Sequence, residues 1–539
     1  MDGPPLSRTD AEPGVGVLEP SLEAACRRWG DRPAITFRGT TTSYAELWAR
    51  VEALGCAYER LGVRPGDRVV CQLRNVPEHV VAINAAWACG AIHAGTDNDL
   101  TGEELSWVVD RTEAAALVYQ PRPDAADPLG PLEAVHKSRP QTVVVVHDAE
   151  STGPAQVSLS ELLEEGVTEP GWRPRYPGPA DIGLLLLTSG TTGRPKAVME
   201  TLRGCWAKMQ FFADAFHPGP DDVHLLYLPM GHVFGLRLSQ IALLSGGRLV
   251  LLDRFSPSEA ARLVTEQRVT VLPGMPTHFT LLLDALDPAR HDVSSLRWAI
   301  SAAATLPRPL VERIYGTLGS EMLYVYGCSE NFTTQTTDRE EILGGSVGRE
   351  VFRAPDGEPP DGTIVAVNPD DHTPLPAGEL GELAFGARGP VRYWKAPPAA
   401  TDGRYYTGDL GRVDADGRVY VLGRIKELVN RGGLKVSPTE IETAARSHPG
   451  VADAAVVGTP DPVLGEAICL CIVPGDDRPD LTEMRAFLGR SLARHKLPDE
   501  LAVVPAVPRT KIGKVDRPAL LARVEAAGGA TERLRGRRE

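Results

Sequence analysis

The chain has 539 residues, of which 42% are hydrophobic and 24% are charged, as in ordinary folded proteins with two or more domains. Its formal net charge of −14 argues against a nucleic-acid-binding protein, because such proteins need a surplus of lysine and arginine near phosphates. The first residues lack the pattern of a secretory signal, and the longest aliphatic runs are four residues, so we expect neither a leader nor a membrane span.

The first clear structural signal is the aliphatic run 184–187, which leads into the segment TSGTTGRPK and predicts a strand followed by a loop. After this loop, four apolar residues recur at spacings of 4, 3 and 4 and mark one face of a helix: Cys205, Met209, Phe212 and Phe216. We interpret this face as core and not as a cofactor contact.

Strand-like and helix-like segments then alternate between residues 223 and 326. The expected strands are 223–229, 248–252, 269–272, 297–300 and 321–326. The expected helices are 256–267, 275–286 and 306–318. Such alternation predicts an α/β fold whose sheet is mostly parallel and carries helices on its faces.

The pattern changes near residue 423, where a smaller α+β domain is expected. Ser437, Pro438 and Glu440 have the spacing of a capping box and predict the start of a helix. Strands at 451–457, 467–473 and 501–504 and a helix near 481–494 complete the expected domain. We therefore predict a large domain over 1–422, a small domain over 423–522 and a disordered tail over 523–539.

The eight cysteines are scattered and form no metal-like pair. The closest two, Cys469 and Cys471, fall on one face of a predicted strand, which indicates buried packing. A reduced, cytoplasmic protein fits this cysteine usage best.

The loop after the first strand combines hydroxyl groups, glycines and a cation: Thr188, Ser189, Gly190, Thr191, Thr192, Gly193 and Lys196. Backbone N–H groups freed by the glycines, together with the lysine charge, suit the phosphates of a nucleotide. The spacing differs from that of a P-loop, since GTTGRPK is followed by Ala197 and not by serine or threonine. Taken alone, the segment is also compatible with a plain turn.

Further motifs follow in a fixed order: LPMGHVFGL (228–236), SAAATL (301–306), YGCSEN (326–331), GELGELAFGARGPVRYW (378–394), YYTGD (405–409), GRIKELVNRGGLKVSPTEIE (423–442) and PRTKIGK (508–514). With the 188–196 loop, they resemble the adenylate-forming superfamily, which includes acyl-CoA synthetases, adenylation domains of peptide synthetases and firefly luciferase. The resemblance covers roughly residues 20 to 520. It implies a large domain of mixed sheets layered with helices, and a smaller mobile domain. It also implies ATP-dependent conversion of a carboxylic acid into an acyl-adenylate, followed by attack of a thiol.

The resemblance also implies roles for single residues. The 188–196 loop would hold the β- and γ-phosphates, Tyr326 would lie against adenine, and Ser329 would contact the α-phosphate. Glu330 would help to hold Mg²⁺. Asp409 and Arg424 would bind the ribose.

Lys514 matches the lysine that bridges the carboxylate and the α-phosphate, and it would form the catalytic set with Lys196, His232 and Glu330. Lys426 matches the hinge about which the small domain moves. Gly432 and Gly433 match a loop beside the thiol tunnel, most similar to that of stand-alone aryl-acid adenylating enzymes.

The resemblance places the acid pocket at His232, Val233, Ala302, Ala303, Ala304, Gly327 and Cys328. Val233 stands where relatives that bind α-amino acids have aspartate and relatives that bind hydroxybenzoate have asparagine. An aliphatic side chain cannot pair with an ammonium group, whose unpaired burial is costly. We therefore expect an apolar aryl, alicyclic or medium-sized aliphatic acid.

The acceptor stays open at this stage. No carrier-protein segment follows Lys514 in the sequence, so coenzyme A, or the phosphopantetheine of a carrier protein supplied in trans, would provide the thiol. Transfer to an amine or another non-thiol nucleophile is an alternative, as is a nucleotide-binding protein without catalysis. The sequence leaves the oligomeric state, the pathway and the identity of the acid open.

Overall fold

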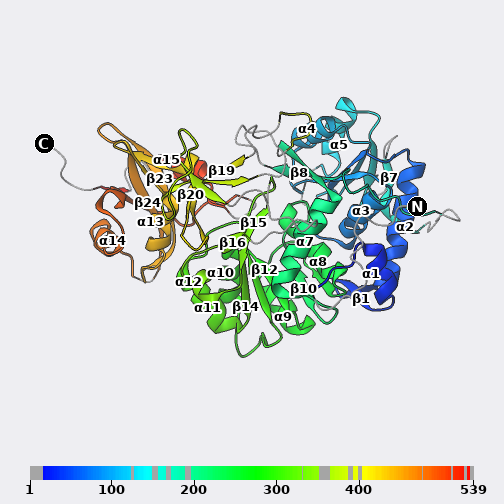
Figure 1. Ribbon diagram of the computed structural model, residues 1–539, viewed down its shortest axis with the longest axis horizontal. Helices are drawn as coiled ribbons and strands as arrows, with labels where there is room; N and C mark the ends of the chain where they lie inside the picture. Colours follow the sequence, from blue (N-terminus) through cyan, green and yellow to red (C-terminus); the bar gives the residue numbers. More distant parts are fainter. Residues whose placement is uncertain are drawn as a thin grey trace.

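The computed structural model describes residues 16–122, 125, 127–147, 156–164, 172–188, 196–330, 332–350, 364–386, 392–397, 404–475, 477–510, 514–526 and 531–533. Within these residues the chain forms four β-sheets with helices between and around them. Figure 1 shows the C-terminal domain at one end of the molecule, with β19 and β20 between this domain and the rest. No helix in the described part of the chain is long and apolar enough to cross a membrane.

The first sheet has seven strands in the order β7-β6-β5-β3-β4-β8-β9. Its strands are β3 (Arg68–Gln72), β4 (Ile92–Gly95), β5 (Ala116–Tyr119), β6 (Val143–Val146), β7 (Gln156–Ser158), β8 (Ile182–Thr188) and β9 (Lys196–Thr201). All neighbours are parallel except β8 and β9. Side chains alternate across this sheet, so Val69 joins the main core whereas Val70 joins a second core on the opposite face.

The second sheet has nine strands in the order β16-β15-β14-β13-β12-β10-β11-β1-β2. Its strands are β1 (Pro33–Phe37), β2 (Thr40–Ser43), β10 (Val223–Leu226), β11 (Arg248–Leu251), β12 (Val271–Gly274), β13 (Trp298–Ser301), β14 (Glu321–Gly327), β15 (Phe332–Thr336) and β16 (Arg349–Glu350). Neighbouring strands in the run β14-β13-β12-β10-β11-β1 are parallel. The strands at the two edges of the sheet, β2 on one side and β15 and β16 on the other, pair antiparallel. The mostly parallel α/β fold expected from the sequence is thus confirmed.

Helices of the large domain cover these two sheets. They are α1 (Leu22–Trp29), α2 (Tyr44–Arg60), α3 (Pro77–Ala88), α4 (Gly102–Thr112), α5 (Gly130–Ser138), α6 (Leu159–Glu164), α7 (Leu202–Phe216), α8 (Val233–Leu244), α9 (Pro257–Gln267), α10 (Pro276–Ala285), α11 (Arg308–Leu318) and α12 (Arg339–Leu343). The predicted apolar face of α7 is buried, and the expected strands and helices between 223 and 326 are confirmed with small shifts of their ends.

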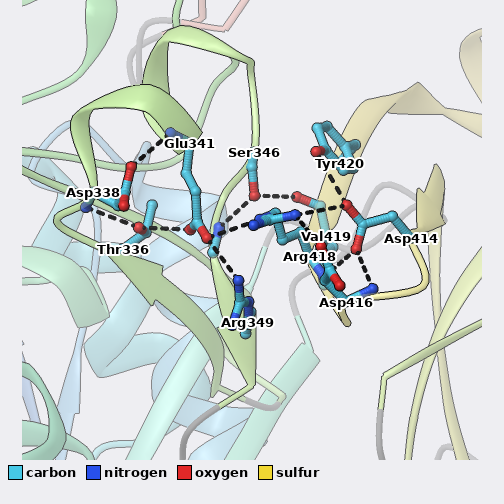
Figure 2. Close-up of polar contacts among 11 residues, drawn as sticks. Thr336, Asp338, Glu341, Ser346, Arg349, Asp414, Asp416, Arg418, Val419 and Tyr420 are labelled. Carbon is cyan, nitrogen blue, oxygen red and sulfur yellow. Dashed lines mark hydrogen bonds and ion pairs between the residues drawn. The ribbon is translucent and has the colours of Figure 1, made fainter.

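The third sheet has the antiparallel order β17-β18-β19-β20, formed by Val365–Val367, Gly381–Gly386, Arg404–Val413 and Val419–Arg424. Figure 2 shows how the turn between β19 and β20 is tied to the segment after β15. Glu341 accepts hydrogen bonds from Thr336 Oγ1 at 2.9 Å and from Arg418 Nε at 2.9 Å. Ser346 Oγ donates to the carbonyl of Val419 at 3.3 Å. These bonds fix the third sheet against the second.

The C-terminal domain contains a six-stranded sheet in which β23 pairs with β24 beside the path β22-β21-β24-β25-β26. Its elements are η1 (Ile425–Glu427), β21 (Val429–Arg431), β22 (Leu434–Val436), α13 (Pro438–Ala445), β23 (Val451–Asp461), β24 (Gly465–Pro474), α14 (Leu481–Leu488), η2 (Arg494–Lys496), β25 (Glu500–Val503), α15 (Arg517–Ala526) and β26 (Thr531–Arg533). Cys469 and Cys471 are buried free thiols on β24, as the sequence predicted.

Three details of this domain correct the sequence-based expectations. The capping box at α13 does not form, because Ser437 Oγ donates to the carbonyl of Leu422 and Glu440 pairs with Lys496 at 2.7 Å. The helix expected near 481–494 ends at Leu488, and a 3₁₀ turn follows it.

The tail expected to be disordered from residue 523 is partly ordered. Helix α15 continues to Ala526, and β26 pairs with β25. Within β26, Glu532 accepts a hydrogen bond from the backbone N–H of Leu481 at 2.8 Å and pairs with Arg478 at 2.9 Å. These bonds connect β26 to the rest of the domain.

Candidate active site

The predicted site residues gather where several strands end. Thr188 is the last residue of β8, and Ala302 directly follows β13. Tyr326 and Gly327 close β14. The carboxyl ends of strands in a parallel sheet are the usual place for ligands in such folds, because the loops that follow the strands meet there.

Asp409 is the centre of the best-defined part of the site. It faces Arg424 directly across the β19–β20 pair, and Asp409 Oδ1 lies 2.7 Å from Arg424 Nε. Tyr326 Oη donates to the other carboxylate oxygen at 2.6 Å. Arg424 Nη1 also donates to the carbonyl of Thr407 at 2.9 Å, which fixes the guanidinium in its plane. Residues from two sheets, widely separated in the sequence, therefore share one carboxylate.

The surroundings of this carboxylate set its protonation. Burial raises the pKa of Asp409, and the charge of Arg424 acts against this rise. Burial, reinforced by the Asp409 carboxylate, raises the pKa of Tyr326 well above its ordinary value, so the phenol remains a hydrogen-bond donor.

The strand residues on either side of the predicted phosphate loop are paired. Thr188 and Lys196 are direct partners in the antiparallel β8–β9 register. Ser189, Gly190, Thr191, Thr192 and Gly193, which were predicted to cradle phosphates, lie outside the described residues. The Lys196 ammonium lies 5.2 Å from the centre of the Tyr393 ring.

Tyr393 was not singled out by the sequence, yet it contacts two predicted site residues. Besides its ring contact with Lys196, its hydroxyl donates to Glu330 Oε1 at 3.2 Å. The hydroxyl of Tyr405 in turn hydrogen-bonds to Tyr393. Burial and the Glu330 charge raise the pKa of Tyr393 well above its ordinary value. The only sequence signal for Tyr393 was its place in the loose motif GPVRYW.

Lys514 comes from the C-terminal domain and lies within electrostatic range of both Asp409 and Arg424. Its backbone N–H donates to Thr510 Oγ1 at 3.2 Å, and its carbonyl accepts from the N–H of Thr510 at 2.7 Å, so these two residues are held together. Crowding by surrounding protein lowers the pKa of Lys514, and the nearby charge of Arg424 lowers it further.

The other residues predicted in the C-terminal domain lie beside this group. Lys426 is exposed in the 3₁₀ turn that directly follows Arg424. Gly432 and Gly433 form the turn between β21 and β22, and both have positive φ, of 59° and 84°. The N–H of Gly432 donates to the carbonyl of Leu464 at 2.7 Å.

The predicted acid pocket begins at the N-terminus of α8. His232 is the N-cap residue of α8, and burial lowers its pKa, which favours the neutral imidazole. Val233 is the first helical residue and packs against the main core. The preceding Gly231 passes so close to Thr96 that a β-carbon would lie 2.0 Å from the Thr96 carbonyl oxygen. This close contact fixes the approach of His232 to the helix.

The three alanines lie on the loop after β13. Ala302 is buried, whereas Ala303 and Ala304 are exposed. Ala303 has a φ of 72°, a left-handed conformation that is unusual for alanine. Tyr324 Oη donates to the carbonyl of Ala304 at 3.2 Å and holds this loop in place. Cys328 and Ser329 follow β14 and are partly buried.

The donor groups present suit a magnesium ion that is held mainly by a substrate. In the described residues no cluster of three or more histidine, cysteine or acidic side chains could hold a metal. Glu330 offers a single carboxylate, of which one oxygen accepts the Tyr393 hydrogen bond. One carboxylate plus substrate phosphates is an ordinary arrangement for Mg²⁺, so this donor set fits.

Comparisons with known proteins identify the family of this chain. The profile of the AMP-binding enzyme family matches residues 22–392, and the profile of the AMP-binding enzyme C-terminal domain matches residues 440–514. Triostin synthetase I of Streptomyces triostinicus is 34% identical over 93% of each chain. The 2,3-dihydroxybenzoate-AMP ligase of Bacillus subtilis (strain 168) is 32% identical, over 93% of this chain and 92% of that one.

A third relative and one solved structure extend the comparison. The 2-hydroxy-7-methoxy-5-methyl-1-naphthoate–CoA ligase of Streptomyces carzinostaticus is 33% identical over 95% of this chain and 93% of that one. The crystal structure of ATP-bound MatB from Rhodopseudomonas palustris superposes with a TM-score of 0.79 at 28% identity, covering 94% of this chain and 99% of that one. From both family profiles and these near-complete alignments, the chain belongs to the AMP-binding enzyme family, the adenylate-forming superfamily that its motif order indicates.

Proposed function

We propose that this chain uses ATP to convert a carboxylic acid into an acyl-adenylate and pyrophosphate, and then transfers the acyl group to a thiol. The observation that carries the proposal is the meeting of charges from two parts of the chain. Asp409 and Arg424 of the third sheet lie within electrostatic range of Lys514 of the C-terminal domain. A reaction between two anions needs such converging positive charge.

The ribose and base of ATP would bind at the Asp409 group. Each oxygen of an ionised carboxylate can accept more than one hydrogen bond, so Asp409 can bind ribose hydroxyls while it keeps Tyr326 and Arg424. The Tyr326 ring is tilted against Phe385 with ring centres 6.2 Å apart, which supports an aromatic platform for adenine.

The phosphates would lie between Lys196 and Glu330. We assign the β- and γ-phosphates to Lys196 and the loop that precedes it, and the α-phosphate to Ser329. Glu330 would share Mg²⁺ with phosphate oxygens, and the ion would neutralise the charge of those phosphates.

Lys514 would act in the first half-reaction. A carboxylate oxygen of the acid attacks the α-phosphorus, and the bond from that phosphorus to the bridging oxygen of pyrophosphate breaks. The Lys514 ammonium would hold both anions together during this step. In the second half-reaction a thiolate attacks the acyl carbon, and AMP leaves with the bonding electrons.

The two half-reactions would alternate by rotation of the small domain about Lys426, which is exposed in a short turn between the third sheet and β21. We place the boundary between the domains at residues 422 and 423 for this reason. Gly432 and Gly433 would border the path of the thiol arm, because their lack of side chains lets a chain pass close to the backbone.

The acid is proposed to be apolar and carboxylic, with an aryl acid favoured over an alicyclic or medium-sized aliphatic one. Val233 at the start of α8 supplies no counter-charge for an ammonium group. The neutral form of His232 and the small Ala302 support the same class. The printed names of two relatives contain aromatic acids, dihydroxybenzoate and naphthoate, which further supports an aryl acid.

Coenzyme A or the phosphopantetheine of a separate carrier protein would supply the thiol. The name of the naphthoate relative includes CoA, which supports the first of these.

Acid-dependent exchange of pyrophosphate into ATP, without thiol, tests the proposal. The panel should include aryl, alicyclic, fatty and amino acids, and Lys514→Ala should be measured beside the wild-type chain. We expect exchange with an apolar acid, and a loss of at least about a hundredfold in the variant, as for removal of a group that stabilises transition-state charge.

Thioester formation from supplied acyl-adenylate should largely survive in Lys514→Ala. An equal loss of both half-reactions would contradict the role of Lys514 in the first step alone. Exchange by the wild-type chain with α-amino acids only would contradict the assigned acid class. Transfer to amines but to no thiol would support the alternative acceptor.

A further inference from the structure

Tyr393 contacts two of the charged groups assigned to the phosphates, and it does so with two different parts of its side chain. The face of its ring lies 5.2 Å from the Lys196 ammonium, whereas its hydroxyl donates to Glu330 Oε1 at 3.2 Å. Lys196 begins β9, and Glu330 lies just beyond β14 in the other large sheet. One aromatic side chain therefore connects charges of opposite sign that belong to different sheets.

The backbone around Tyr393 is anchored to the first sheet. The N–H of Met199 donates to the carbonyl of Arg392 at 2.9 Å, and the N–H of Trp394 donates to the carbonyl of Ala197 at 2.8 Å. Tyr393 itself pairs with Val198 as an isolated antiparallel bridge. The segment 392–394 therefore extends the sheet along β9, and Tyr393 keeps a fixed position relative to Lys196.

A second set of contacts holds the same segment. The guanidinium of Arg68 lies 5.2 Å from the centre of the Trp394 ring. Arg111 Nη2 donates to the carbonyl of Trp394 at 3.1 Å and to that of Lys395 at 2.7 Å. Only 9% of Tyr393 is exposed, so the side chain has little freedom to leave its place.

The hydroxyl of Tyr393 is oriented by its neighbours. Tyr405, on β19, hydrogen-bonds to Tyr393, so the Tyr393 proton is directed to the Glu330 carboxylate. The bond uses Oε1 of Glu330 and leaves Oε2 for another partner. Two tyrosines and one glutamate thus form a short chain of hydrogen bonds beside the lysine.

We infer that Tyr393 is a positioning residue that sets the separation of Lys196 and Glu330, its ring supporting the lysine and its hydroxyl orienting the glutamate. The inference rests on the proposed function for the roles of the two charged groups. It assigns a different task to each part of the tyrosine. The ring affects how phosphates are held, and the hydroxyl affects how Mg²⁺ is shared with them.

Two variants separate these tasks. Tyr393→Phe keeps the ring and removes the hydroxyl, whereas Tyr393→Leu removes both. Tyr420→Phe is a matched control, because Tyr420 also donates to a carboxylate, that of Asp414 at 3.3 Å, in the network of Figure 2 outside the site. Thermal unfolding of each variant, followed by circular dichroism, checks that the fold is kept.

The main readout is ATP binding by calorimetry without acid or thiol, first without Mg²⁺ and then with increasing Mg²⁺. Tyr393→Phe should bind ATP alone with the affinity of the wild-type chain. It should need about tenfold more Mg²⁺ to reach its maximal ATP affinity, as expected for loss of a hydrogen bond to a charged group. Tyr393→Leu should share this defect and should also bind ATP alone about fivefold more weakly, as expected for a lost cation–π contact. Tyr420→Phe should match the wild-type chain.

Three results would overturn the inference. Tyr393→Phe could show the wild-type Mg²⁺ requirement or a lower one, the two Tyr393 variants could be indistinguishable in both measurements, or Tyr420→Phe could show the same shifts. The binding measurement needs no acid, so it can succeed where the proposed function fails. If the variants differ from the wild-type chain as expected, but the wild-type chain catalyses pyrophosphate exchange with none of the acids in the panel, the positioning role is supported and the proposed function is contradicted. A wild-type chain that does not bind ATP contradicts both.

Discussion

The hydroxyl of Ser437, at the start of α13, donates its hydrogen bond to the backbone carbonyl of Leu422 in β20. The two residues lie on either side of the 3₁₀ turn that contains Lys426. Space there is limited, because a β-carbon on Gly423 would lie 2.9 Å from Ser437 Oγ. This contact therefore belongs to the present arrangement of the small domain, and rotation about Lys426 would have to break it.

Ser437→Ala should destabilise this arrangement without altering the nucleotide site. One buried hydrogen bond contributes about 1 kcal/mol, so pyrophosphate exchange should fall by about fivefold. Thioester formation from supplied acyl-adenylate should be unchanged or faster, and single-turnover assays of both half-reactions measure this. Ser447→Ala is the control, because Ser447 Oγ donates to the carbonyl of Thr443, four residues earlier in the same domain. A parallel decline of both half-reactions would count against a conformational role.

The pH dependence of adenylation should reveal Lys514. Lys514 is exposed, yet crowding by surrounding protein and the nearby Arg424 charge lower its pKa below the ordinary value of a lysine. A lysine is charged only below its pKa, so exchange should fall as the pH rises through this lowered value. Lys514→Arg stays charged throughout, and its alkaline limb should lie at higher pH even if its maximal rate is lower.

The measurement is the pH profile of pyrophosphate exchange at saturating ATP. Lys137→Arg, at an exposed position on α5, is the control for the substitution itself. Coinciding alkaline limbs for the wild-type chain and Lys514→Arg would show that another group titrates.

Val233→Asp should weaken the use of apolar acids. Val233 packs against the main core at the start of α8, so an aspartate there would place an unpaired carboxylate beside the acid. We expect kcat/KM for apolar acids to fall by at least about tenfold, a modest part of the cost of burying an unpaired charge. The same substitution at Val463, which is 82% exposed, should have no effect. An unchanged acid preference in Val233→Asp would place the pocket elsewhere.

Glu200 and Arg237 form a buried ion pair that joins β9 to α8. Arg237 Nη2 lies 3.0 Å from both carboxylate oxygens, and Lys208 adds a contact of 2.6 Å. Only 6% of Glu200 and 3% of Arg237 are exposed. The pair thus connects the strand that begins at Lys196 with the helix that begins at Val233.

Glu200→Gln should lower the free energy of unfolding by about 3 kcal/mol, because it leaves the Arg237 charge buried and poorly paired. Urea unfolding followed by tryptophan fluorescence measures this. Replacing both residues, Glu200→Met with Arg237→Met, should recover much of the loss. Asp284→Asn, which breaks the exposed pair with Arg313, should change the stability by less than about 1 kcal/mol. A small effect of Glu200→Gln would mean that water reaches the pair.

The elements of the large domain could be predicted where the local pattern decides the structure. Strands β10 to β14 are short apolar runs between helices with one apolar face, and burial on both sides of a parallel sheet produces that pattern. The cap of α13 could not be predicted, because a tertiary partner, Leu422, competes for the Ser437 hydroxyl. Strand β26 could not be predicted either, since it has three residues and depends on the edge that β25 offers.

The site, too, contains residues that the sequence indicated and one that it did not. The motif order indicated Asp409, Arg424 and Tyr326, and the structure brings these three into direct contact. Tyr393 lies in the motif GPVRYW, but neither its residue type nor its spacing assigns it a role there. Its contacts with Lys196 and Glu330 depend on an extra strand pairing beside β9, which no local pattern encodes.

Arg424 is the last residue of β20, and its partner Asp409 faces it from the next strand of the same sheet. A rotation that begins at Lys426 would therefore leave this pair in place and withdraw Lys514 from it. The site would alternate between two electrostatic states that differ by one positive charge. In the more positive state it would favour the crowded anions of the first half-reaction, and in the other it would let pyrophosphate escape. A single withdrawn ammonium would thus match the charge of the site to the half-reaction in progress.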